Sequence, residues 1–242
     1  MHSFYIETPL GGIATLPPEE AKHALKVLRL RPGDPVCAMD GVGGRWRGEI
    51  GALSGNRVSV KLLEQLPDNE SPLRVTVYQG LPKADKLDFI AQKLTELGAA
   101  RLVPVRMARS VAKLDGKDGE KRRERLDKIA REAAKQCGRG RPLQVDAPMD
   151  WQDALEDMKG RDLMLIPWEE ALKGRVKDAF ADRPDVRDIG VVIGPEGGIT
   201  PEEIGAMTVI GGRCVTLGPR ILRAETAAVV SAALLMTLWG DI

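Results

Sequence analysis

The chain has 242 residues, which is long enough for one large domain or for a domain of ordinary size with a small partner. Hydrophobic residues make up 43% and charged residues 29%, a balance that excludes an intrinsically disordered chain. The formal net charge of +1 identifies no partner. Residues 106–141, however, hold 13 Lys and Arg against 6 Asp and Glu, which fits either a polyanion partner or a solvated helix face.

The cysteines and histidines form no pattern for a metal site. Zinc sites need clustered ligands, and the candidates here stand apart without a CxxC pair. They are Cys37, Cys137, Cys214, His2 and His23. We therefore expect no metal, and the scattered cysteines indicate a reducing compartment.

Neither a secretion signal nor a membrane span is predicted. The stretch MHSFYIETPLGG lacks the apolar core of a signal peptide. The long apolar run Ala227–Trp239 is shorter than the roughly 20 residues that cross a bilayer. We expect a soluble, cytoplasmic protein with no membrane partner.

The N-terminal part, residues 1–70, is expected to form a small β-barrel. Short strand-like segments alternate with glycine turns such as DGVGG and SGN, and Pro17-Pro18-Glu19-Glu20 opens a short helix. The expected strands are Phe4–Ile6, Pro35–Met39, Arg45–Ile50 and Arg57–Leu63. A polar linker with two prolines, Gln65–Leu73, follows.

Residues 71–242 are expected to form an α/β domain. Apolar strands alternate with helical patterns, which indicates a parallel sheet covered on both faces. The expected strands are Val75–Tyr78, Leu102–Val105, Leu163–Ile166, Ile189–Ile193 and Cys214–Leu217. The expected helices are Leu87–Leu97 (ended by Gly98), Glu120–Cys137 and Glu225–Trp239. The last helix is apolar nearly all round, which fits burial against a second subunit or a central place in a monomer.

The stretch VVIGPEGGIT (Val191–Thr200) has the form of a nucleotide loop at the end of a strand. Phosphate is a poor ligand for it, because GxGxxG and the P-loop lysine are both missing. Glu196 adds a carboxylate where phosphate oxygens would lie. Thr200 and Glu203 form a predicted capping box that already uses the helix amides.

A second loop, LGPRILRAET (Leu217–Thr226), also follows a strand and precedes a helix. Two apolar loops with a few polar groups suit an adenosine that carries no phosphate. S-adenosylmethionine, with its positive sulfonium, fits this description. Glycine loops after strands are also common as plain tight turns, and that alternative stays open.

The two motifs IGPEGGIT and LGPRILRAETAA resemble the SPOUT methyltransferases. More narrowly, the chain resembles the bacterial family that methylates N3 of a uridine in 16S ribosomal RNA, the RsmE family. Three further stretches carry the resemblance over nearly the whole chain. They are HALKVLRLRPGD, LPKADKLDFIAQKLTELGA and AAKQCGRGRPL.

The resemblance implies a PUA-like N-terminal barrel (1–70), a C-terminal SPOUT domain with a deep trefoil knot (71–242), S-adenosylmethionine as cofactor, and a homodimer. Knots are rare in proteins, and no periodicity in this sequence predicts one. The expected cofactor-binding residues are Ile193, Gly194, Glu196, Gly197, Leu217, Gly218, Ile221, Leu222 and Thr226. Arg223 is the candidate for stabilising the uridine oxygens and Glu225 the candidate base or orienting group. A salt bridge or a helix-cap role is the alternative for both.

The partner implied is 16S ribosomal RNA or the small ribosomal subunit. Candidate phosphate contacts are Lys26, Arg29, Arg31, Lys83, Lys86, Arg109 and Arg139. For any single one, a solvated surface position is the alternative. Other functions left open are methylation of a ribose 2′-hydroxyl or a tRNA base, and a non-catalytic RNA-binding protein.

Overall fold

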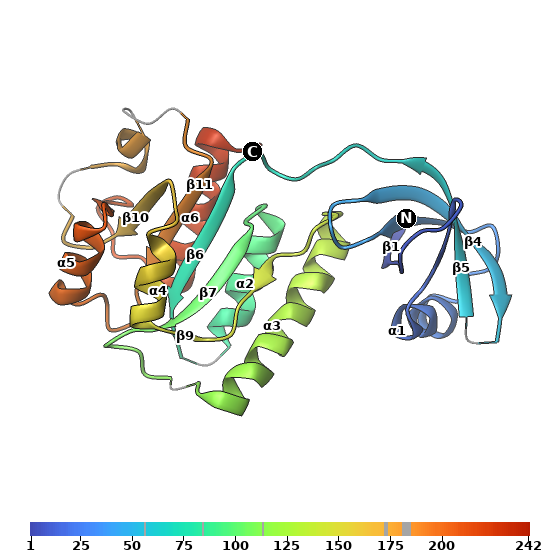
Figure 1. Cartoon of the computed structure of the whole chain (residues 1–242), viewed down its shortest axis with the longest axis horizontal. Helices are drawn as coiled ribbons and strands as arrows, with labels where there is room; N and C mark the ends of the chain where they lie inside the picture. The colour runs from blue at the N-terminus through green and yellow to red at the C-terminus, as the bar shows by residue number, and fades with distance from the viewer. Residues whose placement is uncertain (56, 84, 113, 172–173, 181–184) are drawn as a thin grey trace. The chain divides into compact units, whose positions relative to one another are not determined.

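The computed structural model describes residues 1–242 except 56, 84, 113, 172–173 and 181–184 (Figure 1). The chain divides into two compact units. The first contains Met1–Glu70 and Glu132–Pro142, and the second contains Ser71–Arg131 and Leu143–Ile242. The first unit is therefore made of two separate stretches of sequence. The second stretch, residues 132–142, lies outside the continuous segment 1–70 expected from the sequence.

The first unit is built on a five-stranded sheet with the order β1-β3-β4-β5-β2. The strands are β1 (His2–Tyr5), β2 (Ile13–Thr15), β3 (Pro35–Met39), β4 (Arg45–Ser54) and β5 (Arg57–Gln65). β1 runs parallel to β3 and the other pairs are antiparallel. The helix α1 (Pro18–Lys22) and a π-helical turn (His23–Val27) contribute Ala21 and Ala24 to its apolar core. All four predicted strands are confirmed, whereas the short β2 gives no periodic signal.

The second unit is built on a seven-stranded sheet in which every recorded pair is parallel. Its order is β12-β10-β11-β6-β7-β8, with β9 also paired to β7. The strands are β6 (Arg74–Gly80), β7 (Arg101–Arg106), β8 (Gln144–Val145), β9 (Met149–Asp150), β10 (Leu163–Pro167), β11 (Asp188–Ile193) and β12 (Arg213–Val215). The predicted parallel α/β sheet is confirmed.

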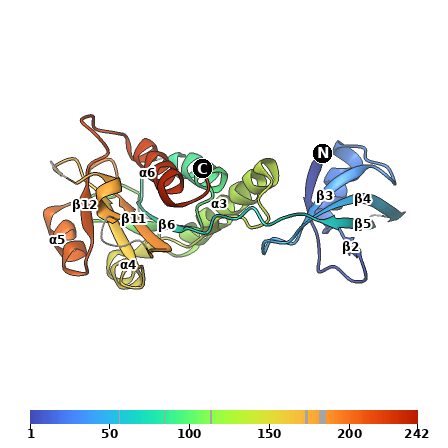
Figure 2. The ribbon, with the colours of Figure 1, turned by 90° about the horizontal axis from the view of Figure 1, so that it is seen from above.

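Helices cover both faces of this sheet (Figure 2). On one face α2 (Lys86–Glu96), α3 (Gly116–Cys137) and α6 (Ala224–Trp239) share a core with Val75 and Val77 of β6. On the other face α4 (Trp151–Met158) and α5 (Pro201–Val209) pack against Tyr78 of the same strand. A 3₁₀ helix (Val176–Phe180) precedes β11. Alternation of apolar residues between two covered faces explains why the strands are apolar throughout.

The helix α6 is not buried on every side in the single chain. Ala228, Ala232 and Leu235 are fully buried, while Leu234 is 37% and Leu238 42% exposed. Of the two expected alternatives, a central place in a monomer is wrong, because one apolar face of the helix remains open to solvent in the single chain. Burial against a second subunit stays a prediction. Among the described residues, we find no helix with the length and apolarity that a bilayer crossing requires.

The start of α5 has the predicted capping box. The Thr200 hydroxyl accepts from the Glu203 amide at 3.2 Å, and Glu203 accepts from the Thr200 amide at 2.9 Å. Glu203 is only 5% exposed and also accepts from the Ala108 amide at 2.8 Å. One side chain thus caps α5 and fixes the loop that follows β7.

We predict that Glu203→Ala lowers the free energy of unfolding by about 1–3 kcal/mol, because it leaves partly buried amides of Thr200 and Ala108 without their acceptor. Urea unfolding measures the change. Glu202→Ala, at the exposed neighbouring position in the same first turn, is the control and should lower stability by less than Glu203→Ala. Equal losses in both variants would contradict the anchoring role of Glu203.

Candidate functional site

Three loops meet at the carboxyl edge of the parallel sheet. The strands β12, β10 and β11 are neighbours, and their register brings Pro167 opposite Val215 and Leu165 opposite Val191. The loops after them begin at Trp168, Gly194 and Thr216. In open α/β sheets this edge is where ligands bind.

The loop after β11 is a tight turn with close backbone packing. The Gly198 amide donates to the Pro195 carbonyl at 2.9 Å, and Gly198 has a φ of +77°. A side chain on Gly194 would lie 2.7 Å from Ile199 Cγ1, and one on Gly198 would lie 3.0 Å from Glu169 Oε1. Because both positions are glycine, no side chain fills the space beside the loop backbone and the Glu169 carboxylate.

The same loop is packed on the end of β6. A Cβ added to Gly80 would lie 2.6 Å from Pro195 Cδ and 2.7 Å from the Pro195 nitrogen. The Gln79 side-chain amide donates to the Gly80 carbonyl at 2.9 Å, with the Gly194 carbonyl at 3.5 Å. The loops after β6 and β11 therefore have fixed positions relative to each other.

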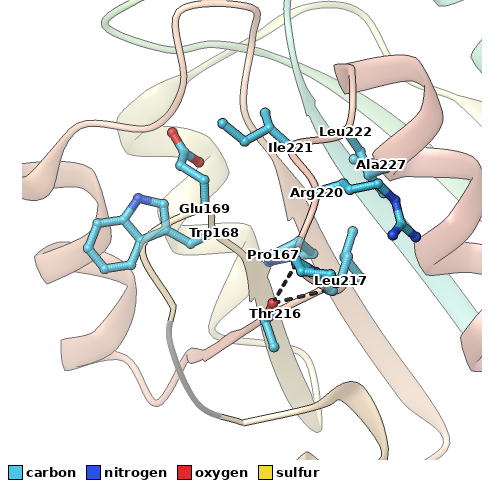
Figure 3. Close-up of a pocket in the computed structure, with 11 residues that line it drawn as sticks. Pro167, Trp168, Glu169, Thr216, Leu217, Arg220, Ile221, Leu222 and Ala227 are labelled. Atoms are coloured by element: carbon cyan, nitrogen blue, oxygen red, sulfur yellow. Dashed lines mark hydrogen bonds between the residues drawn. The ribbon is translucent and has the colours of Figure 1, made fainter.

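The loop after β12 begins with a turn centred on Thr216 (Figure 3). The Thr216 hydroxyl accepts from the Gly218 amide at 3.1 Å and donates to the Gly218 carbonyl at 3.2 Å. Gly218 has a φ of +116°, a conformation that side chains disfavour. Thr216 and Gly218 together set the direction of the segment that continues to Ile221 and Leu222.

Two cavities lie at these loops and share part of their walls. The large cavity, about 430 Å³, lies against the loop after β11, and the small cavity, about 120 Å³, lies against the loop after β12. The shared residues are Pro167, Glu169, Ile221, Leu222 and Ala227. The volume of the large cavity falls within the range of small-molecule sites.

Most of the expected cofactor residues line these cavities. The large cavity has Ile193, Gly194, Glu196, Gly197, Ile221, Leu222 and the candidate catalytic residue Arg223. The small cavity has Leu217 and Gly218. Thr226 lines neither and is exposed, because it lies one turn into α6. Glu225 also lies outside the lining, but its carboxylate contacts Lys86, which does line the large cavity.

The loop after β10 also lines the cavities, although none of its residues was among the expected site residues. Pro167 and Glu169 line both cavities, and Trp168 lines the small one. In Figure 3 the Glu169 side chain extends toward Ile221, while the Trp168 indole points away from the other residues drawn. The available signal was position, since Trp168 and Glu169 directly follow a predicted parallel strand.

Glu196 is bound to protein groups. Its carboxylate accepts from the Lys83 amide at 3.1 and 3.3 Å and pairs with Lys86 Nζ at 2.9 Å. Burial opposes ionisation, but the bond from Lys86 and the backbone amides lower the pKa of Glu196 below its usual range. The hydrogen bond to Glu196 raises the pKa of Lys86. Both groups are therefore charged at neutral pH.

The candidate RNA contacts fall into two groups. Lys26, Arg29, Arg31, Lys83 and Arg109 are exposed. The first three form no ion pair with another described residue, and Arg29 has a φ of +55° that is uncommon outside glycine. Arg109 donates to the Gly197 carbonyl at 3.0 Å. Lys86 instead pairs with two carboxylates.

Arg139 does not have the surface position expected of a phosphate contact. It is 6% exposed, and its guanidinium pairs with Glu70 at 2.7 Å inside the first unit. Because the same carboxylate also accepts from the Arg141 amide at 3.0 Å, this pair fixes residues 139–141 in the first unit. The burial and ion pair of Arg139 fit a structural role better than the expected phosphate contact.

The positive excess of the basic segment 106–141 is partly offset by the fold. Several of its cations pair with carboxylates outside the segment, and others pair with carboxylates inside it that the excess already counts. Examples are Arg106 with Asp150, Arg122 with Asp88, Arg123 with Glu120, Arg131 with Asp127, and Lys135 with Glu20. The excess of positive charge in this segment therefore gives little support for a polyanion site.

Comparison with known proteins identifies the family. An RNA methyltransferase domain family matches residues 69–236, and an RNA methyltransferase PUA domain family matches residues 16–63. The chain is 38% identical to ribosomal RNA small subunit methyltransferase E of Bacillus subtilis over 94% of this chain and 93% of that protein. The chain belongs to the ribosomal RNA small subunit methyltransferase E family. The resemblance found in the sequence is confirmed.

Further members of the family are similar to this chain over nearly its full length. The protein of that name from Mycobacterium bovis is 36% identical, with 94% of this chain and 88% of that protein covered. A crystal structure of the Neisseria gonorrhoeae methyltransferase E bound to S-adenosyl methionine has a TM-score of 0.89 and 32% identity, and covers 100% of this chain and 99% of that chain. The whole fold described above, both units included, is thus the fold of this family.

We predict opposite effects for two glycine substitutions in this family member. Gly80→Ala must displace Pro195 and should lower the free energy of unfolding by about 1–3 kcal/mol. Gly205→Ala, inside α5 with nothing within 4 Å, should raise it by about 0.5–1 kcal/mol. Thermal and urea unfolding measure both. A neutral Gly80→Ala would mean that the loop after β11 is not fixed by β6.

Proposed function

We propose that this protein transfers a methyl group from S-adenosylmethionine to N3 of a uridine in 16S ribosomal RNA of the small ribosomal subunit. Membership of the ribosomal RNA small subunit methyltransferase E family supports the reaction class and the RNA. The Neisseria gonorrhoeae relative bound to S-adenosyl methionine supports the cofactor. The observation that carries the proposal is the large cavity between two glycine loops at the strand ends.

The large cavity fits this cofactor better than a phosphorylated nucleotide. Its glycines leave space for backbone contact with an adenosine, and Ile193, Ile221 and Leu222 supply apolar walls. Two carboxylates, Glu169 and Glu196, and two cations, Lys86 and Arg223, line this cavity, and Lys86 also pairs with Glu225. The lining therefore offers a phosphate no excess of positive charge, whereas its carboxylates can attract a sulfonium.

Residues of both loops would hold the cofactor. Backbone groups of Gly194, Gly197, Leu217, Gly218 and Leu222 are the candidates for binding its adenosine and methionine parts. Glu196 acts indirectly in this scheme, because Lys83 and Lys86 already hold its carboxylate. Thr226 is left out, because it lies away from both cavities. When bound, S-adenosylmethionine supplies an electrophilic methyl group on a positive sulfur.

The target nitrogen carries a proton on its Watson–Crick edge, so the uridine must be unpaired or flipped out. Arg223 lies at the large cavity and can donate hydrogen bonds to the uracil oxygens as N3 loses its proton. Glu225 follows two residues later and can accept that proton. Methyl transfer itself requires N3, the methyl carbon and the sulfonium sulfur in line.

Several finer features remain proposals that follow from family membership. They are a deep trefoil knot formed around the loops after β11 and β12, closure of the first unit into a PUA-like barrel, a homodimer, and a cytoplasmic location. The exposed Leu234 and Leu238 on α6 support a second subunit at that face. A ribose 2′-hydroxyl or tRNA target, or a non-catalytic RNA-binding protein, are the outcomes that would replace the proposed reaction.

The reaction is tested with labelled S-adenosylmethionine and small ribosomal subunits from a strain that lacks its native enzyme. The free RNA is assayed in parallel. Digestion to nucleosides and mass spectrometry should identify 3-methyluridine. Label on a ribose, or no transfer to either substrate, would refute the proposal.

Arg223→Ala should lower kcat by about a hundredfold or more, because a donor to the developing oxyanion is lost. Cofactor affinity, measured by calorimetry, should change by less than about threefold, since the contact is made mainly in the transition state. Arg223→Lys keeps the charge and should retain part of the rate. A wild-type rate for Arg223→Ala would remove this residue from the mechanism.

Removal of Lys26, Arg29 and Arg31 together should weaken RNA binding and reduce its salt dependence. Each lost phosphate contact lowers the slope of log K against log salt by about 0.7–0.9. Filter binding at several salt concentrations measures the slope. Arg57→Ala, which removes one exposed charge from a strand end of the same unit, is the control. An unchanged slope in the triple variant would show that these side chains do not contact phosphate.

A further inference from the structure

Lys86 joins two carboxylates from different loops. It is the first residue of α2, and its Nζ lies 2.9 Å from Glu196 Oε1 and 3.2 Å from Glu225 Oε2. The side chains of Lys86, Glu196 and Glu225 are 29%, 27% and 18% exposed. Water therefore screens the charges only in part, and their mutual effects are stronger than on an open surface.

One of the two carboxylates is fixed independently of Lys86. Glu196 accepts from the Lys83 amide through both oxygens, and its neighbour Pro195 packs on the backbone of Gly80. Glu196 therefore sets the position of the ammonium group. The ammonium in turn reaches Glu225 in the first turn of α6.

The remaining charged groups around Glu225 do not replace Lys86. Glu169, after β10, and Arg223, before α6, line the same cavity. Asp88, also on α2, faces α3 and pairs with Arg122 and Arg125. Among the ion pairs of the described residues, the cation that reaches Glu225 is Lys86.

Loss of the ammonium would leave two carboxylates close together in a partly buried cluster. Like charges in such a site disfavour ionisation, so one carboxylate takes up a proton at a higher pH than usual. Glu196 keeps its hydrogen bonds from the Lys83 amide, which favour its charged form. The proton would therefore go to Glu225, which could then no longer accept one from the substrate.

We propose that Lys86 is a positioning residue for methyl transfer: held by Glu196, its ammonium group holds the Glu225 carboxylate in place as proton acceptor for the uridine. The inference rests on the proposed function and extends it to residues outside the two loop motifs. In the step itself Glu225 takes the N3 proton while the N3–methyl bond forms and the methyl–sulfur bond breaks, which leaves a neutral thioether. Lys86 accordingly serves Glu225 and not RNA phosphate.

The test is the pH dependence of the single-turnover methylation rate at saturating cofactor and RNA. Three variants are compared with the wild type from about pH 4 to about pH 9, a range that includes the ordinary pKa of a glutamate: Lys86→Met, Lys86→Arg and Glu196→Gln. Lys93→Met is the matched control, since it removes a lysine from the same helix whose ion pair among the described residues is with the nearby Glu96. Cofactor affinity and thermal unfolding are measured for each variant to establish that it is folded.

In Lys86→Met the acidic limb of the profile should move to higher pH by about one unit or more. At pH values below both limbs the rate then falls about tenfold for each unit of displacement, and the two profiles converge toward pH 9. Glu196→Gln should leave the limb in place or move it to lower pH. The Lys86 ammonium group then pairs with Glu225 and no longer with a charged residue at position 196. Lys86→Arg and Lys93→Met should keep the wild-type profile.

A purely structural connection between the loops predicts a different result. Lys86→Met and Glu196→Gln would then lower the rate by a similar factor at every pH without moving the limb, and that outcome would overturn the proposal. A profile of Lys86→Met that coincides with the wild type would also overturn it. Failure of the proposed function is distinguishable, because it would appear as absence of 3-methyluridine in the wild-type product.

Discussion

Parallel pairing of β12, β10, β11 and β6 is the constraint on which the site depends. Because these strands are neighbours and run in one direction, their carboxyl ends lie along one edge of the sheet. Loops that begin 22 or more residues apart in the chain thereby come together. The packing of Pro195 against Gly80 then fixes two of them relative to each other. Cavity, charge cluster and candidate catalytic groups all follow from this arrangement.

Charge determines what that edge can bind. A glycine loop after a parallel strand suits phosphate when amides and a lysine point at the ligand. Here the lysine of the site, Lys86, is paired with Glu196 and Glu225. The amides at the start of α5 are partly used by the Thr200–Glu203 box. The cavity keeps apolar walls, the Glu169 carboxylate and the Arg223 guanidinium, without an excess of positive charge for a phosphate chain. This arrangement favours a nucleoside without phosphate.

Local patterns predicted most of the strands and helices and two of the loops that line the cavities. Strands with continuous apolar runs, the capping box and both glycine loops were all visible in the sequence, since each depends on adjacent residues. Lys86 and Glu169 were not assigned to the cavity, because strand order, which local patterns do not contain, brings them there. The interpretation of the basic segment stayed open for a related reason. Carboxylate partners of its cations, such as Asp88, Asp150 and Glu20, lie on other elements. Arg139 likewise meets Glu70 only in the folded first unit.

Selection of a phosphate-free cationic nucleoside is the central claim, and equilibrium binding tests it most directly. Isothermal titration of the purified protein would compare S-adenosylmethionine with ATP, which carries the same adenosine but a negative triphosphate. The account predicts saturable binding of S-adenosylmethionine and no detectable binding of ATP under the same conditions. ATP binding of equal or greater affinity would contradict it.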